Sequence, residues 1–413
     1  MTHLKTAGFK LVVLACLASA WACGSHSGSN QAVSVQATGS INQPVDFDAL
    51  GLGDLISFDV YRDGDRIHAL FAARNQHADR PFIGYVRSDD GGEHWQPATE
   101  ITQNPALLAL QSRMGNDVQI AAHGDTLMAV WQVGGEMPGM GPLVSLTSSD
   151  GGQHWTQGAR PSAIDTDQSH PDLIADTGGR FHLVWLDDRD ENGHQGLRYA
   201  QNTDDRQGWQ QAQTLDDSSC SCCWNRLLAN HDQQLFALYR DMEPRDMALA
   251  VSADGGQHWQ QKGHAGAFDW HFDGCPHNGG ALALSGSKTV DALVWTGAEQ
   301  KNGLYHLKST DNGASWSQPR RMGDATAFHA DLVALDALHR LAVWDAMTDN
   351  GASIQLSLSS DGGASWSAAR TLSQPAVSAT FPRVVVSRYG WLILWQAQSA
   401  GGSRQWVSTL IKQ

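Results

Sequence analysis

The chain of 413 residues has few basic side chains. It carries 28 Lys and Arg against 43 Asp and Glu, so its formal net charge is −15. Nucleic acids and anionic membrane surfaces are recognised by a basic face, which this composition does not supply. The composition therefore argues against both as partners, and the acidic excess instead favours solubility or the attraction of cations.

Charge in general is sparse, at 17% of the residues, whereas glycine occurs 42 times. The apolar run at residues 11–22, LVVLACLASAWA, is too short to be a membrane span, which needs about 20 residues. Lys5 and Lys10 precede it, an arrangement typical of an export signal. The sequence therefore predicts an exported, turn-rich β protein.

Ala-Trp-Ala-Cys at positions 20–23 resembles a lipoprotein cleavage site, at which Cys23 becomes the acylated first residue. Gly24 then favours anchoring at the outer membrane or periplasmic side of a bacterial cell envelope. An ordinary secretory signal is the alternative, and both routes lead to an oxidising compartment. The predicted parts of the chain are a signal at 1–22, a flexible tether at 23–31 and one folded domain at 32–413.

An eight-residue pattern, Ser-x-Asp-x-Gly-x-x-Trp, occurs five times, and a degenerate sixth copy contains Asn202, Asp204 and Trp209. Periods near fifty residues are typical of propeller blades or solenoid units. In such a turn Asp accepts backbone hydrogen bonds, Gly adopts a positive φ, and we expect Trp to bury the turn against its own sheet. The predicted role is structural for these pairs: Asp90 and Trp95, Asp150 and Trp155, Asp254 and Trp259, Asp311 and Trp316, Asp361 and Trp366.

A second repeat sets the number of units at seven. Apolar strands that end in an aromatic residue lead to Phe71, Trp131, Trp185, Tyr239, Trp295, Trp344 and Trp395. The seventh unit has only three strand-like runs before Gln413, and residues 32–45 can supply a fourth strand. The sequence predicts an all-β, seven-bladed propeller of four-stranded antiparallel blades, each with its own small core, closed by this N-terminal strand.

The eight-residue boxes resemble the Asp-box, or bacterial neuraminidase (BNR) repeat, of the sialidase superfamily. The resemblance covers residues 54–413. It implies the propeller fold, but function must be argued from the site, because this fold carries several activities.

Propeller geometry indicates which residues meet at one mouth of the central channel. The starts of the innermost strands share a face with the loops between the second and third strands. These segments carry cysteine, histidine, carboxylate and arginine side chains, so this mouth is the predicted site. The boxes are expected on the opposite face.

Four cysteines follow the export segment, Cys220, Cys222, Cys223 and Cys275, and the innermost strands that they precede belong to neighbouring blades. Two disulfides are one interpretation, because an even number of cysteines in an exported protein usually pairs. A copper or zinc site built from these thiolates and His277 is the other. The absence of Cys-x-x-Cys-His argues against covalently attached haem.

The segments CSCCWN at 220–225, YRD at 239–241 and GCPHNGG at 274–280 resemble those of a subset of exported sialidase-like proteins. Copper-handling proteins would fit this resemblance. His277 stands at a variable position of that pattern, where it adds a possible metal ligand.

Resemblance to sialidases also raises glycoside hydrolysis. Such enzymes hold the substrate carboxylate with arginines and use a tyrosine as the nucleophile. They often have an Arg-Ile-Pro motif near the N-terminus, and this sequence contains no such motif. The weak catalytic candidates are Tyr239, Arg240, Asp241, Arg245 and Arg383. Tyr239 stands where other units have Trp, which favours a core role for its ring.

Two His-x-Asp pairs, His170 with Asp172 and His329 with Asp331, begin innermost strands. They either tie neighbouring strands together or act as metal ligands or their orienting partners. The leading hypothesis is a monomeric envelope protein that binds copper, zinc or a small ligand at the mouth, in copper or redox handling. The alternative is a sialidase-like glycoside hydrolase acting on a terminal sugar of a glycan.

Overall fold

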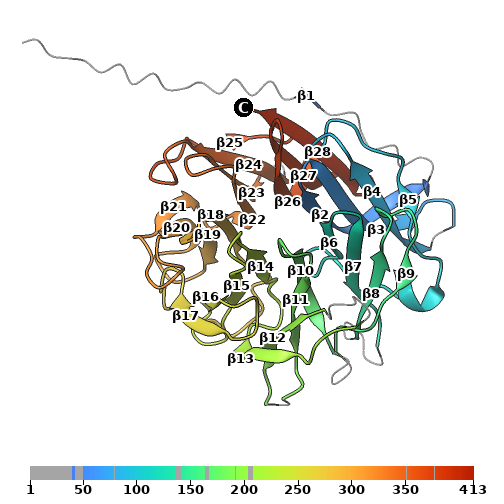
Figure 1. The fold of residues 1–413 in the computed structure, drawn as a ribbon. Helices are drawn as coiled ribbons and strands as arrows, with labels where there is room; N and C mark the ends of the chain where they lie inside the picture. Colours follow the sequence, from blue (N-terminus) through green and yellow to red (C-terminus); the bar gives the residue numbers. More distant parts are fainter. Residues whose placement is uncertain are drawn as a thin grey trace, which may run out of the picture. The chain divides into compact units, whose positions relative to one another are not determined.

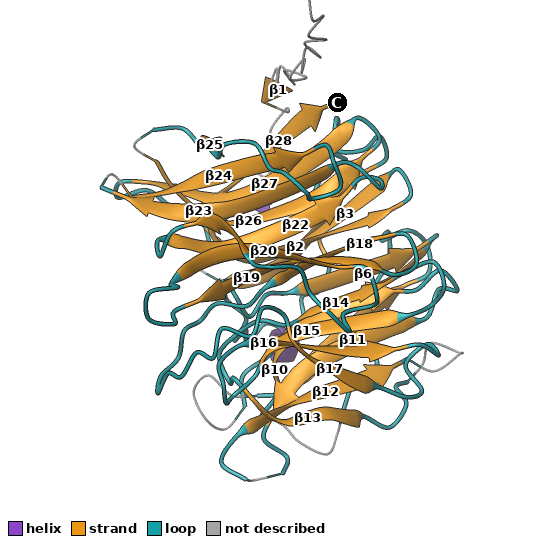
Figure 2. Ribbon diagram, turned by 90° about the vertical axis from the view of Figure 1, so that its left-hand side faces the viewer, coloured by secondary structure: helices purple, strands orange, loops and turns teal. Residues whose placement is uncertain are grey.

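The computed structural model describes residues 40–41, 50–78, 80–135, 141–162, 167–190, 192–202, 208–349, 351–375 and 377–413. Residues 37–413 form one compact unit. Its described part consists of seven four-stranded antiparallel sheets arranged as blades around a central axis (Figure 1). Strands dominate the side view as well (Figure 2), and the helical structure of the described residues is limited to short 3-10 segments such as η2 (Pro105–Leu107). The seven-bladed, all-β prediction is confirmed.

The first three blades follow the order of the chain. Blade 1 contains β2 (Leu52–Asp63), β3 (Arg66–Asn75), β4 (Pro81–Ser88) and β5 (Thr99–Glu100). Blade 2 contains β6 (Gln119–His123), β7 (Thr126–Gln132), β8 (Leu143–Ser148) and β9 (Thr156–Gln157). Blade 3 contains β10 (Ser169–Ala175), β11 (Phe181–Asp187), β12 (Gln195–Gln201) and β13 (Gln213–Ser219).

The next three blades repeat this arrangement. Blade 4 contains β14 (Arg226–Ala229), β15 (Leu235–Arg240), β16 (Met247–Ser252) and β17 (Gln260–His264). Blade 5 contains β18 (Ala281–Ser285), β19 (Thr289–Thr296), β20 (Gly303–Ser309) and β21 (Arg320–Gly323). Blade 6 contains β22 (Ala327–Ala334), β23 (Arg340–Thr348), β24 (Gly351–Ser359) and β25 (Arg370–Thr371).

Blade 7 joins the two ends of the fold. It contains β26 (Val377–Ser387), β27 (Gly390–Ser399), β28 (Gln405–Lys412) and the two-residue β1 (Ser40–Ile41). β1 pairs antiparallel with β28, and Ser40 lies opposite Leu410. The innermost strand β26 also contacts β2 of blade 1, so the ring of innermost strands is continuous.

The hydrophobic core lies between the blades. Each of seven buried clusters takes its side chains from two adjacent blades, as in the cluster that joins Phe58 and Phe71 of blade 1 to Leu394 of blade 7. The expectation that each blade has its own small core is therefore wrong. A four-stranded sheet has two apolar faces, and the neighbouring blades cover both.

The boxes connect the third and fourth strands, as the repeat predicts. In the first copy Ser88 Oγ accepts a hydrogen bond from the N–H of Gly92 (2.8 Å), and Asp90 accepts one from the N–H of His94 (2.8 Å). The same bonds recur in the other four copies. In the degenerate copy Asn202 pairs with Trp209 in an isolated bridge, and Asp204 lies outside the described residues.

The box tryptophans correct one expectation. Trp155 packs edge-to-face on Tyr85, which lies in the third strand of the preceding blade, with 5.5 Å between ring centroids. Trp259 packs in the same way on Tyr199 at 4.8 Å. The box therefore fastens its blade to the preceding blade, whereas the expected contact was with its own sheet.

No helix in the described part of the chain is both long and apolar enough to cross a membrane. Cys23 and the expected signal and tether lie outside the described residues.

Candidate functional site

The cysteines lie in two connections between blades. Cys220, Cys222 and Cys223 follow β13 of blade 3 and precede β14 of blade 4, and the N–H of Cys220 donates to the carbonyl of Arg240 (2.9 Å). Cys275 lies in the next connection of this kind, between β17 and β18. Both connections end at innermost strands, as the sequence predicted.

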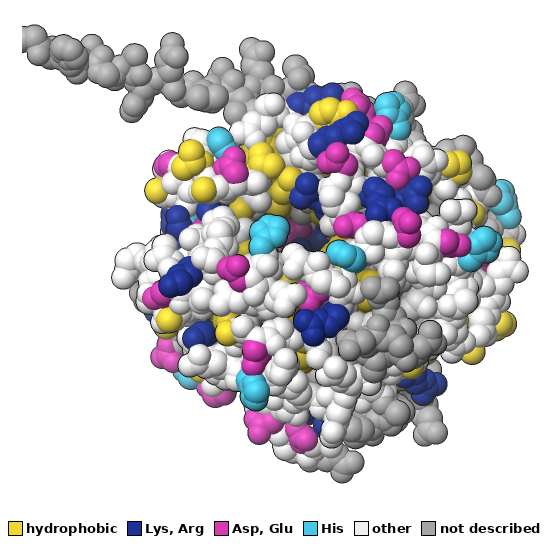
Figure 3. Space-filling model, in the orientation of Figure 1, with side chains coloured by type: hydrophobic (Ala, Val, Ile, Leu, Met, Phe, Trp, Pro, Cys, Tyr) yellow, Lys and Arg dark blue, Asp and Glu magenta, His cyan; other side chains and the backbone are white. Residues whose placement is uncertain are grey.

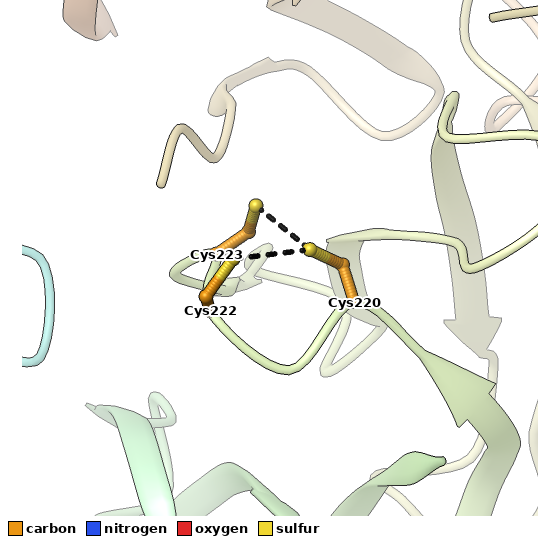
Figure 4. Close-up of side chains that lie close together, drawn as sticks. All are labelled: Cys220, Cys222 and Cys223. Atoms are coloured by element: carbon orange, nitrogen blue, oxygen red, sulfur yellow. Dashed lines mark hydrogen bonds between the residues drawn. The ribbon is translucent and has the colours of Figure 1, made fainter. Parts of the chain in front are cut away.

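Three thiols converge in the first connection. The Sγ atom of Cys220 lies 3.6 Å from that of Cys222 and 3.1 Å from that of Cys223 (Figure 4), and all three residues are buried. A disulfide bond is about 2.05 Å long. These cysteines and the exposed Cys275 are free thiols in the structure.

Cys275 and His277 lie close to one of these three cysteines, Cys222. The ligand atoms of Cys222, Cys275 and His277 all lie within 4.8 Å of one another, and so do those of Cys220, Cys222 and Cys223. We call these five residues the Cys–His cluster. It consists of a buried triad and a more open triad, which have only Cys222 in common.

Two buried arginines lie beside the cluster. Arg240 is 1% exposed and donates hydrogen bonds to the carbonyls of Asn278 (2.9 Å), Arg245 (2.5 Å) and Trp295 (3.0 Å). Arg245 is 6% exposed and donates to the carbonyl of Phe272 (3.1 Å). Neither guanidinium forms an ion pair with a carboxylate of the described residues. Buried charges are normally paired, so these two are unusual.

The thiols and the guanidinium groups are coupled electrostatically. Hydrogen bonds from Cys222 and Cys223 lower the pKa of Cys220, and the charge of Arg245 lowers it further. The hydrogen bond to Cys220 raises the pKa of Cys222, and burial raises that of Cys223. The first negative charge of the group therefore belongs on Cys220.

The donor set fits a soft metal. Thiolates and imidazole are preferred ligands of Cu(I) and Zn(II). A metal–sulfur bond of about 2.3 Å separates the sulfurs of a tetrahedral site by about 3.8 Å. The thiol spacing in each triad is compatible with that value after small side-chain rotations.

His170 lies close enough to interact electrostatically with Cys220 and His277. Burial lowers the pKa of His170 to about 3, so its imidazole is neutral at physiological pH. The Nδ1 of His170 lies 2.9 Å from Ser169 Oγ, and the backbone N–H of His170 donates to Asn116 Oδ1 (2.7 Å).

The two aspartates of the His-x-Asp pairs tie innermost strands together. Asp172 accepts a hydrogen bond from the N–H of Leu227 in the next blade, and Asp331 accepts one from the N–H of Val384 (2.9 Å). Arg226 bridges the two carboxylates, at 2.8 Å from Asp331 and 3.7 Å from Asp172. These groups brace the ring of innermost strands, and Arg226 follows Cys223 by three residues in the chain.

Other charged residues extend this bracing. Arg383 pairs with Asp117 (2.8 Å), and Asp59 accepts the N–H of Ile120 (2.9 Å). Burial raises the pKa of Asp59 to about 7 and that of Asp172 to about 6. A central cavity of about 350 Å³ has Asp59, Asp172 and Arg226 in its wall. The face shown in Figure 3 is hollowed near its centre, with charged and histidine side chains around the hollow.

Trp224 connects the cysteine segment to the channel. It lines a narrow pocket together with Asn225 and Arg226, and its indole N–H donates to the carbonyl of Gly280 (3.2 Å). His329 lies 5.6 Å from Trp224 between ring centroids and 3.7 Å from Phe381. The Nδ1 of His329 contacts Asp345 at 2.6 Å, which holds the imidazole in place.

The hydrolytic candidates do not gather at one point. Tyr239 is 1% exposed in the core between blades 3 and 4, and its hydroxyl donates to Asp216 (2.5 Å). Burial and the charge of Asp216 raise the pKa of Tyr239. Asp241 contacts His264 at 2.9 Å. Neither Tyr239 nor Asp241 lines the central cavity, and Arg383 lines a separate, narrower pocket that shares Asp59, Asp172 and Arg226 with it.

Sequence reasoning missed two features of the site. It placed Arg240 and Arg245 at the same mouth as the cysteines but considered them only as catalytic candidates, and it did not predict that they are buried without carboxylate partners among the described residues. It also missed Asp59, because the innermost strand of blade 1 has no box, histidine or cysteine nearby to mark it.

A comparison with protein families matches residues 65–271 to the BNR repeat-like domain. No match to a curated protein was found. Among solved structures, a polysaccharide lyase of family PL25, an ulvan lyase, is 9% identical, with 91% of this chain and 96% of that chain covered and a TM-score of 0.59. YCF48 bound to D1 peptide is 14% identical, with 88% and 93% covered and a TM-score of 0.54.

The NanB sialidase from Streptococcus pneumoniae is 10% identical, with 91% of this chain and 71% of that chain covered and a TM-score of 0.48. At these identities the likeness concerns the fold. The family match spans half of the chain and includes three of the boxes and the Cys-x-Cys-Cys segment. With its seven blades and its repeated boxes, the chain belongs to the family of the BNR repeat-like domain.

Proposed function

We propose that this propeller binds a soft metal ion, copper or zinc, at the Cys–His cluster. The observation that carries the proposal is the convergence of four thiols and one imidazole from two separate connections. Metal–thiolate complexes of this composition have a net negative charge, and Arg240 and Arg245 supply buried positive charge that no carboxylate of the described residues neutralises.

The residues of the Cys–His cluster differ in their exposure to solvent. The buried thiols of Cys220 and Cys223 exclude water from one side of the site, and exposed Cys275 and His277 give solvent access on the other. Each thiol loses its proton to solvent when it binds a metal, so affinity must rise with pH. A role in copper or redox handling is consistent with such a site.

The test is elemental analysis and thiol counting on protein purified without oxygen. We expect stoichiometric copper or zinc in the unaltered chain and its loss in the Cys222→Ser, Cys275→Ser variant. A His77→Ala variant is the control, because His77 is exposed in blade 1. A count of zero thiols together with no metal would establish the disulfide interpretation and refute this proposal.

A second candidate is a glycoside hydrolase of the sialidase-like kind, which membership of the family favours. The central cavity offers Arg226 and the two carboxyl groups of Asp59 and Asp172 to a sugar. A fluorogenic sialoside assay tests it. Turnover that survives the double cysteine variant but is lost in Asp59→Asn, which alters the wall of the central cavity, would favour this candidate over metal binding.

We also propose that the chain is exported and lipid-anchored through Cys23 in a bacterial cell envelope, and that it acts as a monomer. The export signal and the cysteine after it support this location. Mass spectrometry of the N-terminus from the native host tests it. An unacylated N-terminus near residue 23 would indicate the ordinary secretory route instead.

A further inference from the structure

The Cys–His cluster contains two sets of three ligands, not one set of five. The buried triad is Cys220, Cys222 and Cys223, and the open triad is Cys222, Cys275 and His277. Cys222 is the only member of both. No single position offers bonding distance to all five donors in this arrangement, because the two sets do not merge into one group within 4.8 Å.

Two three-coordinate ions match this arrangement better than one four-coordinate ion. A tetrahedral zinc site places its four ligands about 3.8 Å apart in all six pairs. Cu(I) is a soft ion that thiolates select, and it accepts three ligands readily. A thiolate sulfur has lone pairs for two metals, so Cys222 is placed to bridge them.

Charge is compatible with the same count and argues against two Zn(II) ions. Four thiolates carry four negative charges, and two Cu(I) ions leave a net charge of minus two. Arg240 and Arg245 are buried beside the thiols and carry two positive charges without carboxylate partners in the described part of the chain. Two Zn(II) ions would neutralise the thiolates completely and leave both guanidinium groups uncompensated in the interior. One Zn(II) ion would leave the same net charge as two Cu(I) ions, so the separation of the two triads, and not charge, argues against a single ion.

We propose that the cluster binds two Cu(I) ions, one in each triad, with the Cys222 thiolate bridging them. This inference rests on the proposed soft-metal function. Binding involves no electron transfer, since copper enters and stays as Cu(I), and each thiol that becomes a ligand releases its proton to solvent. The open triad is at the surface and is the one that exchanges copper with solution.

The test is an anaerobic titration of the full chain with Cu(I) against a coloured Cu(I) chelator. We expect two equivalents in the unaltered protein and one in a Cys275→Ser, His277→Asn variant. Asn is chosen because residue 277 has a φ of 50°, a left-handed conformation that Asn tolerates. X-ray absorption of the two-copper form should contain a copper–copper distance, and that of the variant should not.

The outcomes separate the two proposals. No Cu(I) and no Zn(II) bound would refute the metal function itself. One equivalent of Cu(I) in the unaltered protein, or two in the Cys275→Ser, His277→Asn variant, would leave the metal function standing and overturn the two-ion arrangement. Both altered residues are exposed, so folding of the variant can be verified by circular dichroism, and His77→Ala again serves as the control.

Discussion

At the scale of single residues, the two arginines at the cluster differ from other buried arginines of the protein. Arg340 is fully buried and pairs with Asp291 (3.0 Å), and Arg198 pairs with Asp187 (2.6 Å). Arg245 has only a carbonyl as its partner in the side-chain contacts described. Its counter-charge is therefore expected from a ligand, and this difference can be measured.

Replacing Arg245 with Met should leave the metal-free protein at least as stable, because an unpaired buried charge is removed. Metal affinity should fall by about tenfold or more, since a nearby positive charge is lost. Thermal unfolding and competition with a chelator measure the two effects. In Arg340→Met, by contrast, the carboxylate of Asp291 loses its guanidinium partner and keeps only the contact with His306, which should cost about 3–5 kcal/mol. Equal destabilisation of both variants would contradict this account.

Asp59 gives a prediction about pH. Burial raises its pKa from 3.8 to about 7, so the folded state holds the proton more tightly than the unfolded chain does. This contribution to stability is complete below pH 3.8 and is lost as the pH rises through about 7. Asp172, with a pKa of about 6, adds to the same trend.

The Asp59→Asn variant keeps an acceptor for the N–H of Ile120 and removes the ionisation. Its melting temperature should therefore change less between pH 5 and pH 8 than that of the unaltered protein, which should decline. Melting curves across this range are the measurement. A parallel decline in both proteins would show that Asp59 does not titrate as described.

Residue identity predicted the location of the thiols but not the surroundings of each side chain. The positions of Cys222 and Cys275 before neighbouring innermost strands were enough to expect their proximity. The guanidinium groups beside them depend on how two blades pack, which no local pattern in the sequence encodes. The same applies to Tyr239, whose hydrogen bond to Asp216 crosses between blades 3 and 4.

At the scale of elements, the boxes act as fasteners between blades. Gly256 has a φ of 91°, and a Cβ atom placed on it would lie 1.7 Å from the hydroxyl of Tyr199 in the preceding blade. Gly263 has a similar φ of 80°, but a Cβ atom there would meet nothing within 4 Å. The two glycines thus separate the cost of backbone conformation from the cost of packing.

Gly263→Ala should cost about 1–2 kcal/mol, the price of left-handed backbone for a residue with a Cβ atom. Gly256→Ala should cost about 1–3 kcal/mol more, because the methyl group also displaces Tyr199. Denaturant unfolding of both variants gives the difference. Equal losses would mean that the contact between the box and the preceding blade is not tight.

Repeats predicted the elements well because each blade solves the same folding problem. The turn bonds at Asp90, the seven second strands and the place of the boxes all follow from local patterns. The prediction that a box tryptophan packs on its own sheet was wrong, since the same motif is compatible with packing on either adjacent sheet. The left-handed backbone of His170, His329 and Phe381 also escaped prediction, because it arises at bulges where innermost strands shift register.

At the scale of the whole molecule, closure joins residues that are far apart in the chain. Arg383 of blade 7 pairs with Asp117, which lies just before the first strand of blade 2. Ser387 of blade 7 donates to the carbonyl of Gly91 in the box of blade 1 (2.6 Å). Leu394 is fully buried in the cluster shared by blades 7 and 1. Since each hydrophobic cluster is shared by two blades, loss of a buried side chain between blades 7 and 1 should destabilise the entire ring.

Leu394→Ala should lower the free energy of unfolding by about 2–5 kcal/mol, as expected for a buried leucine. Unfolding should remain one transition, with the same midpoint by far-ultraviolet and near-ultraviolet circular dichroism, because no blade is stable without its neighbours. Leu338→Ala, at a position that is 54% exposed, should change little. Separate midpoints in Leu394→Ala would indicate that blades unfold independently.

The thiols lie on connections between blades and outside every strand, so the residues of the proposed site are distinct from those that form the sheets. Residues 220–223 and 275–277 contribute nothing to the pairing of β14 or β18, whose partners lie farther along the chain. These two short stretches are therefore open to replacement while the scaffold stays the same. If they were moved together with the two guanidinium groups onto another propeller with the same inter-blade geometry, the proposed metal site should move with them.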